Sequence, residues 1–306
     1  MKCTVILVFL CMLVLTASAT FGATITVPGD YATIGEAVAA ASDGDIINVS
    51  PGTYTENIVV DKPVSIRGVK GANVTAVTGA VLSTDPVIQI KSSDVTVSGF
   101  TISGGTRRWA AGVWIDGYDY ADANGFTAGL SNVTVSHCVL ENNTIGIGIA
   151  LTDGSRIVNN TIRSNLDYAS FGACCFTGGI MVCHCRYLSS TLNTQIINNE
   201  IHHNDGCGIV FNSFYWTTPW NVSGTKIFGN NFYLNGNSDA GVLEWASDIS
   251  LCPVVGSITI AGNKILARTA HGYDIDGIWM WSAPDAKVVG NPVRAELGPN
   301  LPMPTP

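Results

Sequence analysis

The apolar positions of this chain recur in short runs with alternating polar residues, and asparagine and glycine separate the runs. Six segments share one pattern and begin at positions 98, 136, 159, 198, 230 and 262: "SGFTIS", "SHCVLE", "NNTIRS", "NNEIHH", "NNFYLN" and "GNKILA". Most are followed by a glycine and an apolar run, and these glycines stand at 112, 146, 179, 208, 241 and 277. The spacing of 29 to 36 residues predicts a repeat of one small structural unit.

Each unit reads as three short strands, which are too small to bury their own apolar side. Stacked units would form three parallel sheets around a narrow core, and aligned asparagines could hydrogen-bond from coil to coil. Asparagine and glycine suit the sharp turns because both tolerate left-handed backbone conformations. The absence of helices between the strands argues against a Rossmann-like fold or a barrel, and an antiparallel sandwich would not repeat Asn-Asn at a fixed phase. The inward positions expected from this alignment are Ile102, Leu140, Ile162, Ile201, Tyr233 and Leu266.

One helical stripe precedes the repeats. Ile34, Ala37, Val38 and Ala41 share a helical face, and Asp30 is the expected N-cap. Such a helix would close the first end of the core.

The first 19 residues carry a lysine, an apolar stretch and a small-residue end at Ala17-Ser18-Ala19, which is typical of a secretory signal peptide. Cleavage is expected after Ala19, or as late as Ala23, and no later stretch is long and apolar enough to span a membrane. A formal net charge of −8 with 12% charged residues argues against a nucleic-acid partner. The expected organisation is a signal peptide over 1–19, one repeat domain over 24–295 and a Pro-rich tail over 296–306.

The opening "GDYATIGEAVAAASDGDIINVSPGTYTENIVV", followed by "DKPVSIRG", resembles the first coils of right-handed parallel β-helix proteins of the pectate-lyase-like superfamily. The later "NNxI…GI" coils are similar to the subgroup known as carbohydrate-binding and sugar-hydrolysis domains. The resemblance covers about residues 24–295 and implies an all-β fold, a right-handed parallel β-helix (solenoid) with an N-terminal capping helix. For activity it implies little, because the superfamily includes lyases, hydrolases, esterases and structural proteins.

Long insertions flank the glycine-led strand on both sides and predict a loop-walled trough along the solenoid. Aromatic rings along such a groove suit the apolar faces of sugar rings. The alternative is that the loops cover these rings and form a second small core. The expected ligand-binding residues are Trp114, Asp116, Asn212, His271, Trp279 and Trp281.

Four carboxylates fall on or beside three consecutive coils: Asp205, Asp239, Glu244 and Asp276. A pair of them could act as general acid and base on a glycosidic bond, or hold a calcium ion. The alternative is that aspartates beside glycine are turn residues. Only "AHGYDID" has a faint likeness to the motifs of galacturonan hydrolases, and the bases that a lyase would need, Arg107 and Arg108, lie several coils away. If the protein is an enzyme, hydrolysis is therefore expected rather than elimination.

Seven cysteines remain after removal of the signal, and in an oxidising compartment most should form disulfides. The candidates are Cys174, Cys175, Cys183, Cys185, Cys207 and Cys252, with metal binding around His184 as the alternative. The odd number leaves one thiol over, and Cys252 is the expected link to a second chain. Glycosylation sequons stand at Asn48, Asn73, Asn132, Asn142, Asn159 and Asn221.

These features predict a secreted or cell-surface protein that binds, and under one interpretation also cleaves, an extended polysaccharide or cell-surface glycan. The alternative is a structural envelope subunit, a coat or sheath component that self-associates through lateral β contacts and an intermolecular disulfide.

Overall fold

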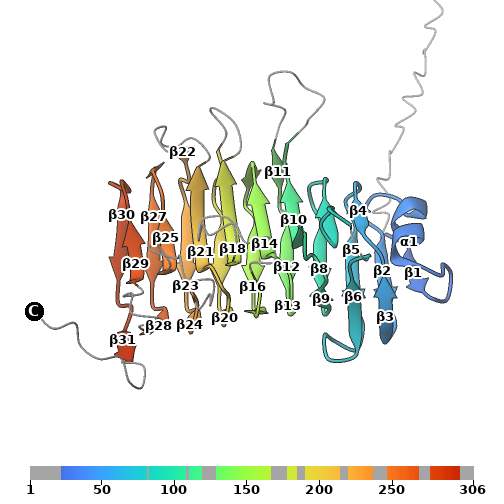
Figure 1. The fold of residues 1–306 in the computed structure, drawn as a ribbon. Helices are drawn as coiled ribbons and strands as arrows, with labels where there is room; N and C mark the ends of the chain where they lie inside the picture. The colour runs from blue at the N-terminus through green and yellow to red at the C-terminus, as the bar shows by residue number, and fades with distance from the viewer. Residues whose placement is uncertain are drawn as a thin grey trace, which may run out of the picture.

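The computed structural model describes residues 22–80, 83–107, 110–118, 129–166, 178–184, 190–213, 220–236, 247–268 and 276–296. Within these residues the chain winds into a stack of coils built from short strands, and the predicted parallel β-solenoid is confirmed (Figure 1). The one helix of the described part, α1 (Ile34–Ala40), lies at the N-terminal end of the stack.

Three long sheets run along the described stack, and their neighbouring strands pair in parallel from one coil to the next. The ten-stranded sheet contains β1 (Thr24–Val27), β2 (Ile46–Val49), β5 (Ser65–Gly68), β8 (Thr96–Ser98), β12 (Thr134–Ser136), β16 (Arg156–Val158), β19 (Gln195–Ile197), β23 (Thr225–Phe228), β27 (Ile258–Ala261) and β30 (Ala286–Val289). The nine-stranded sheet contains β3 (Gly52–Thr55), β6 (Thr75–Thr78), β9 (Thr101–Ser103), β13 (Val139–Glu141), β17 (Thr161–Arg163), β20 (Glu200–His202), β24 (Asn231–Tyr233), β28 (Lys264–Arg268) and β31 (Val293–Glu296).

The eight-stranded sheet contains β4 (Ile58–Val60), β7 (Ile88–Ile90), β10 (Ala111–Asp116), β14 (Ile145–Ala150), β18 (Gly178–His184), β21 (Cys207–Ser213), β25 (Ser247–Leu251) and β29 (Asp276–Met280). Two short pairs extend from the stack: β11 (Leu130–Ser131) with β15 (Thr152–Asp153), and β22 (Trp220–Asn221) with β26 (Val254–Val255).

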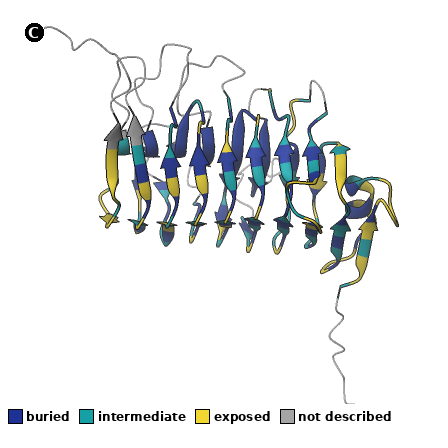
Figure 2. Cartoon of the chain, turned by 90° about the horizontal axis from the view of Figure 1, so that it is seen from below, coloured by how far each residue is buried: buried dark blue, intermediate teal, exposed yellow. Residues whose placement is uncertain are grey.

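The narrow core consists of inward side chains that stack in register, and Figure 2 shows it as a buried band between exposed edges. Along the nine-stranded sheet, Ile162 pairs with Ile201, then Phe232, then Ile265. The expectation that Tyr233 and Leu266 point inward was wrong, because Gly229 stands in place of the first asparagine in the coil of β24, and Leu266 is the strand partner of Tyr233. Aligning the motifs on Asn-Asn shifts the register by one residue, and such a shift reverses the face on which every side chain lies.

Helix α1 covers the N-terminal end of the core, as predicted, with Ile34, Ala37 and Val38 buried. Its N-cap is Thr33 rather than Asp30: the Thr33 side chain accepts from the Glu36 N–H, and the Glu36 carboxylate accepts from the Thr33 N–H. This reciprocal arrangement satisfies two backbone donors at the helix start. The Asp30 carboxylate instead accepts from the backbone and hydroxyl of Thr26 at 2.7 Å and closes the preceding turn.

The corners between sheets repeat one local structure: a residue with positive φ, followed by a residue whose side chain points into the core. His137, Asn159, Asn198, Gly229 and Gly262 hold the first position at the corner between the ten- and nine-stranded sheets. An asparagine occupies the second position in four of these five corners, and Cys138 takes it in the first. In the repeated Asn-Asn and Gly-Asn pairs, the first residue therefore adopts the left-handed conformation and the second places its amide in the core.

The buried amides form a ladder along the stack. Asn160, Asn199, Asn230, Asn263 and Asn291 each donate from Nδ2 to a backbone carbonyl one coil back, and all but the last donate to the next Oδ1 at 2.9–3.1 Å. Backbone N–H groups donate to the same oxygens, so the polar groups of each corner are satisfied inside the core.

A second ladder, which the sequence analysis did not identify, runs five residues further along each coil, between the nine- and eight-stranded sheets. Asn143, Asn165, Asn204 and Asn235 are linked by Nδ2–Oδ1 hydrogen bonds of 2.8–3.2 Å. The ladder ends at Asp248, whose Oδ1 accepts from the Asn235 Nδ2 at 2.8 Å. The Asp248 side chain is buried, and its Oδ2 has no hydrogen-bond partner among the described residues. Burial raises the pKa of Asp248 to about 7.

The C-terminal end of the described stack differs from the N-terminal end. Val288 and Val293 are in register with the buried Ile260 and Ile265, yet they are 40% and 53% exposed. The final strands β29, β30 and β31 each pair on one side only within the described residues.

We predict that Asn199→Ala lowers the free energy of unfolding by roughly 3 kcal/mol, because it leaves buried donors of the neighbouring coil and the Ile157 carbonyl without partners. The exposed Asn231, whose side chain makes no such bond, provides the matched control Asn231→Ala, which should change stability by less than about 0.5 kcal/mol. Urea unfolding measures both variants. Equal effects would contradict a stabilising role of the ladder.

We also predict that stability falls with rising pH because of Asp248. Its folded-state pKa lies about three units above the unfolded value, so the folded state retains the proton longer. The stabilising contribution is complete below about pH 4, is lost as the pH rises to about 7, and totals roughly 4 kcal/mol. Asp248→Asn should remove this decline and raise the melting temperature at pH 8. The exposed Asp43→Asn is the control, and an unchanged pH profile of Asp248→Asn would contradict the prediction.

Candidate functional site

The outer face of the eight-stranded sheet is apolar over much of its length. In β10 and β14 all six residues are buried, so the alternation that marks a strand with one wet face is absent. The outward side chains form a second apolar layer, the outer cluster: Ala111, Trp114, Tyr118, Ile145, Ala150, Met181, Cys183, Cys207 and Val210, with Leu151 packed against it. The predicted trough is therefore filled in the coils of β10 to β21.

Strand register explains how this layer is assembled. Trp114 pairs with Gly148, which pairs with Met181 and then Val210, so these positions form one outward row. The indole of Trp114 lies over Gly148, where any Cβ would overlap the ring. A large side chain beside a glycine fills the row without a gap, and Trp114 is only 8% exposed.

Two further predicted ligand-binding residues, Asp116 and Asn212, are also buried, at 3% and 1% exposure. The Asp116 Oδ2 accepts from the Gln89 Nε2 at 2.8 Å, and its Oδ1 accepts from the Tyr118 N–H at 3.3 Å. Burial raises the pKa of Asp116, although the bond from Gln89 and the charge of Lys91 oppose that shift. Asp116 is thus a hydrogen-bonded carboxyl beneath the surface. Sequence analysis did not identify Gln89, which belongs to the preceding coil.

The aromatic pair at the C-terminal end of this sheet is partly exposed to solvent, unlike Trp114. Trp279 is half-buried and Trp281 is 47% exposed, with ring centroids 6.5 Å apart and planes inclined by 54°. Trp279 continues the outward row through Ser250 of β25. Met280, although in register with the buried Leu251, is 47% exposed because β29 is the last strand of its sheet in the described part.

Two of the four predicted catalytic carboxylates are described by the structure. Asp205 lies between β20 and β21, two residues before Cys207, and its N–H donates to the Asn165 carbonyl at 2.9 Å. Asp276 begins β29 and is in register with Ser247, whose Oγ lies 3.9 Å from the Cys207 Sγ. The two residues therefore stand at the same edge of the sheet, two coils apart, which is about 10 Å along the stack.

The remaining predicted residues, Asp239, Glu244 and His271, lie outside the described residues. The apolar run expected after Gly241 also begins outside the described residues. The described strand that pairs with β21 in this coil is β25, which begins at Ser247. Its Asp248 occupies the register of Gly208 and faces the core. For calcium, the described part contains no group of three His, Cys, Asp or Glu side chains that could hold a metal ion.

The cysteines are distributed over both apolar layers. Cys138 is a free thiol in the core, where burial raises its pKa to about 11. Cys183 and Cys207 belong to the outer cluster, and Cys174, Cys175 and Cys185 lie outside the described residues. Cys252 is 1% exposed, so the expectation that it offers a surface thiol to a second chain was wrong.

The described residues include no helix with the length and apolar character needed to cross a bilayer.

Comparison with known proteins supports the fold. A family model described as a right-handed beta helix region matches residues 64–291. A cell surface glycoprotein of Methanothermus fervidus is 33% identical over 106 residues, which is 35% of this chain and only 14% of that protein. An alginate lyase from Paenibacillus superposes with a TM-score of 0.57 at 16% identity over 89% of this chain and 99% of its own. The pectate lyase Pel9A gives 0.55 at 12% identity over 90% and 78%. At these identities the two lyases establish the fold alone.

We predict that Trp114 and Trp281 respond differently to truncation. Trp114→Ala should lower the free energy of unfolding by about 3 kcal/mol or more, because it opens a cavity in the outer cluster. Trp281→Ala removes a ring that is 47% exposed and should cost less than about 1 kcal/mol. Chemical denaturation of the two variants tests this. A stable Trp114→Ala variant would show that the outer cluster does not contribute to folding.

Proposed function

Because the chain belongs to the right-handed beta helix family, we propose that it is a secreted or cell-surface protein that binds an extended polysaccharide on its eight-stranded sheet. Binding is centred at the C-terminal end of that sheet, where Trp279 and Trp281 lie. The tilted, partly exposed tryptophan pair is the observation that carries this proposal.

The chemistry of the pair suits a sugar chain. Indole faces bind the apolar C–H faces of pyranose rings, and two rings set at an angle can contact successive sugar units of a twisted chain. Trp114, by contrast, is enclosed in the outer cluster, so we propose a short binding surface at one end rather than a trough along the whole sheet.

The names of similar proteins agree with this proposal without establishing it. Two neighbours in fold are named as lyases of alginate and pectate, and the relative from Methanothermus fervidus is named a cell surface glycoprotein. The chain spans 14% of that relative, so the proposed location at the cell surface rests on one shared segment.

Cleavage is an additional proposal for the same face. Asp205 and Asp276 lie near the same edge of the sheet, two coils apart. A carboxyl separation of about 6.5–9.5 Å would imply inversion, and about 5 Å would imply retention. The described candidate base for a lyase, Arg107, precedes β10, three strands before β21 in the sheet order, so hydrolysis remains the expected chemistry.

A structural subunit is the second candidate function. It is favoured by the open last coil, in which Val288 and Val293 are exposed although they continue core positions. Assembly would proceed by strand contacts at this end, since the cysteine expected to link chains is buried.

We predict that the double substitution Trp279→Ala/Trp281→Ala weakens polysaccharide binding at least about tenfold, because each stacked ring contributes on the order of 1 kcal/mol. Phe228→Ala is the matched control, since Phe228 is an aromatic residue of the ten-stranded sheet with 52% exposure. A glycan array followed by affinity electrophoresis measures the change, and melting curves confirm the fold.

Unchanged binding in the tryptophan variant would exclude this face. The same samples should be assayed for reducing ends and unsaturated products, with Asp205→Asn and Asp276→Asn as inactive variants. If the unmodified protein releases neither product, the cleavage proposal fails while binding stands.

A further inference from the structure

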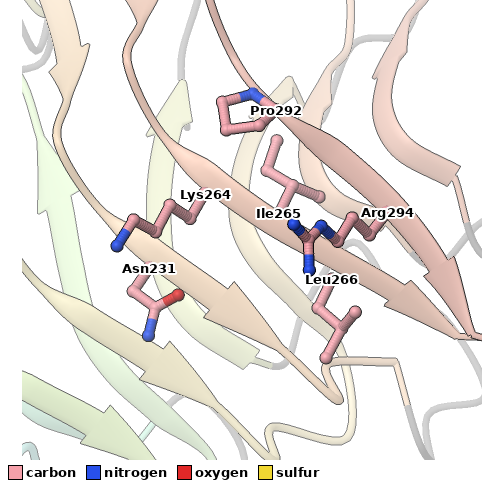
Figure 3. A pocket seen from close by; sticks show the side chains of 6 residues that line it. All are labelled: Asn231, Lys264, Ile265, Leu266, Pro292 and Arg294. Atoms are coloured by element: carbon pink, nitrogen blue, oxygen red, sulfur yellow. The ribbon is translucent and has the colours of Figure 1, made fainter.

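A pocket of about 370 Å³ lies on the outer face of the nine-stranded sheet, away from the tryptophan pair. Figure 3 shows the side chains that line it, which come from the last three strands of that sheet and from the residue before β31: Asn231, Lys264, Ile265, Leu266, Pro292 and Arg294. Nothing proposed above for the eight-stranded sheet uses these residues.

The pairing of strands across coils brings the lining residues of the pocket together. Asn231 of β24 pairs with Lys264 of β28, and Leu266 of β28 pairs with Arg294 of β31. Because the inward positions of these strands are Phe232, Ile265 and Val293, the paired residues on either side of them point outward. In Figure 3 the Lys264 ammonium group extends towards Asn231, and the Arg294 guanidinium group lies beside Leu266.

The pocket carries two positive charges without compensating acids. The chain has a net charge of −8, yet the lining residues include a lysine and an arginine and no Asp or Glu. Within the described residues, the ion pair that does form on this sheet joins Arg163 to Glu141 at 2.8 Å, and these residues lie four and five strands before β31. Among the described residues, neither the Lys264 nor the Arg294 side chain makes an ion pair or a hydrogen bond. Both side chains are therefore available to bind an anion.

The remaining lining residues suit a ring rather than a bare ion. Leu266 and Pro292 supply apolar surface beside the charges, and the Asn231 amide can both donate to and accept from a hydroxyl group. Arg294 offers a planar pair of donors that matches a carboxylate, whereas Lys264 acts as a compact charge.

Residues of the neighbouring coils limit how far such a ligand can extend. The Tyr233 ring stacks on His202 at 4.4 Å, and its hydroxyl donates to the Glu200 carboxylate at 2.7 Å. Burial, with this bond and the Glu200 charge adding to it, raises the pKa of Tyr233 to about 12, so the phenol stays neutral. The Glu200 carboxylate of β20 would repel a second anionic sugar unit placed over that strand. The positive potential that favours an anion is therefore confined to the last three strands.

We propose that this pocket binds a single anionic sugar unit, with its carboxylate on Lys264 and Arg294 and its ring against Leu266 and Pro292. The site is separate from the tryptophan surface, so the molecule would hold a charged saccharide on one sheet and an extended chain on another.

The test uses isothermal titration calorimetry at low ionic strength with three probes: glucuronic acid, its methyl ester and inorganic sulfate. The acid should bind at least about tenfold more tightly than the ester, which lacks the charge, and than sulfate, which lacks the ring. Lys264→Gln/Arg294→Gln should weaken binding of the acid at least about tenfold. The matched control Arg156→Gln/Lys226→Gln removes the same charge from exposed positions on the ten-stranded sheet and should bind within about twofold of the unmodified protein.

Three results would overturn the proposal: no binding of the acid, equal binding of acid and ester, or an equal loss in the control variant. Sulfate binding as tight as that of the acid would reduce the site to a general anion site and overturn its saccharide part. If the double variant does not fold, binding of the acid is measured with the single variants Lys264→Gln and Arg294→Gln instead. Trp279→Ala/Trp281→Ala should bind the acid normally, so that failure of the proposed polysaccharide surface and failure of this pocket are distinguishable.

Discussion

The buried asparagine amide is the interaction on which this structure depends. A coil that turns three times needs sharp corners, and a sharp corner carries backbone groups that cannot pair within their own coil. The two ladders satisfy these groups with side chains from the coils before and after, at 2.8–3.2 Å. Because each amide must meet its neighbours at one height, the ladders also hold all three sheets in a common register. The apolar core can then remain narrow, because the ladder amides are hydrogen-bonded at the corners.

This constraint explains which parts of the fold were readable from the sequence. The repeat, the parallel sheets, the capping helix and the asparagine ladder follow from the spacing of Asn, Gly and apolar residues. The errors arose where another residue type met the same requirement: Gly229 replaces asparagine at the left-handed position, so alignment on Asn230 displaced the expected core residue to Tyr233 and to its strand partner Leu266. The second ladder was hidden because only Asn143 follows an asparagine, whereas the other members follow Ser164, His203 and Leu234, so no common pair repeats along the chain.

The candidate site was less predictable, for a different physical reason. Alternation reports which residues point away from the core, but not whether water or protein lies beyond them. Trp114, Asp116 and Asn212 occupy outward positions and are nevertheless buried, because the eight-stranded sheet has apolar layers on both faces. Trp279 and Trp281 occupy equivalent positions and are partly exposed. Gln89, Lys264 and Arg294 are brought to their neighbours by strand register across coils, which local sequence patterns do not report.

The two ends of the stack give the molecule a mechanical polarity. Helix α1 seals one end with three buried side chains, whereas the last coil exposes Val288 and Val293 and pairs on one side only in the described part. In a one-dimensional stack each coil is stabilised by its nearest neighbours, so the end coil with one neighbour has the least to lose on opening. Local unfolding of the described stack would then begin at its C-terminal coils and proceed coil by coil towards α1. Both the tryptophan pair and the basic pocket lie in these last coils. A ligand that contacts more than one of these coils would therefore stabilise them against local unfolding.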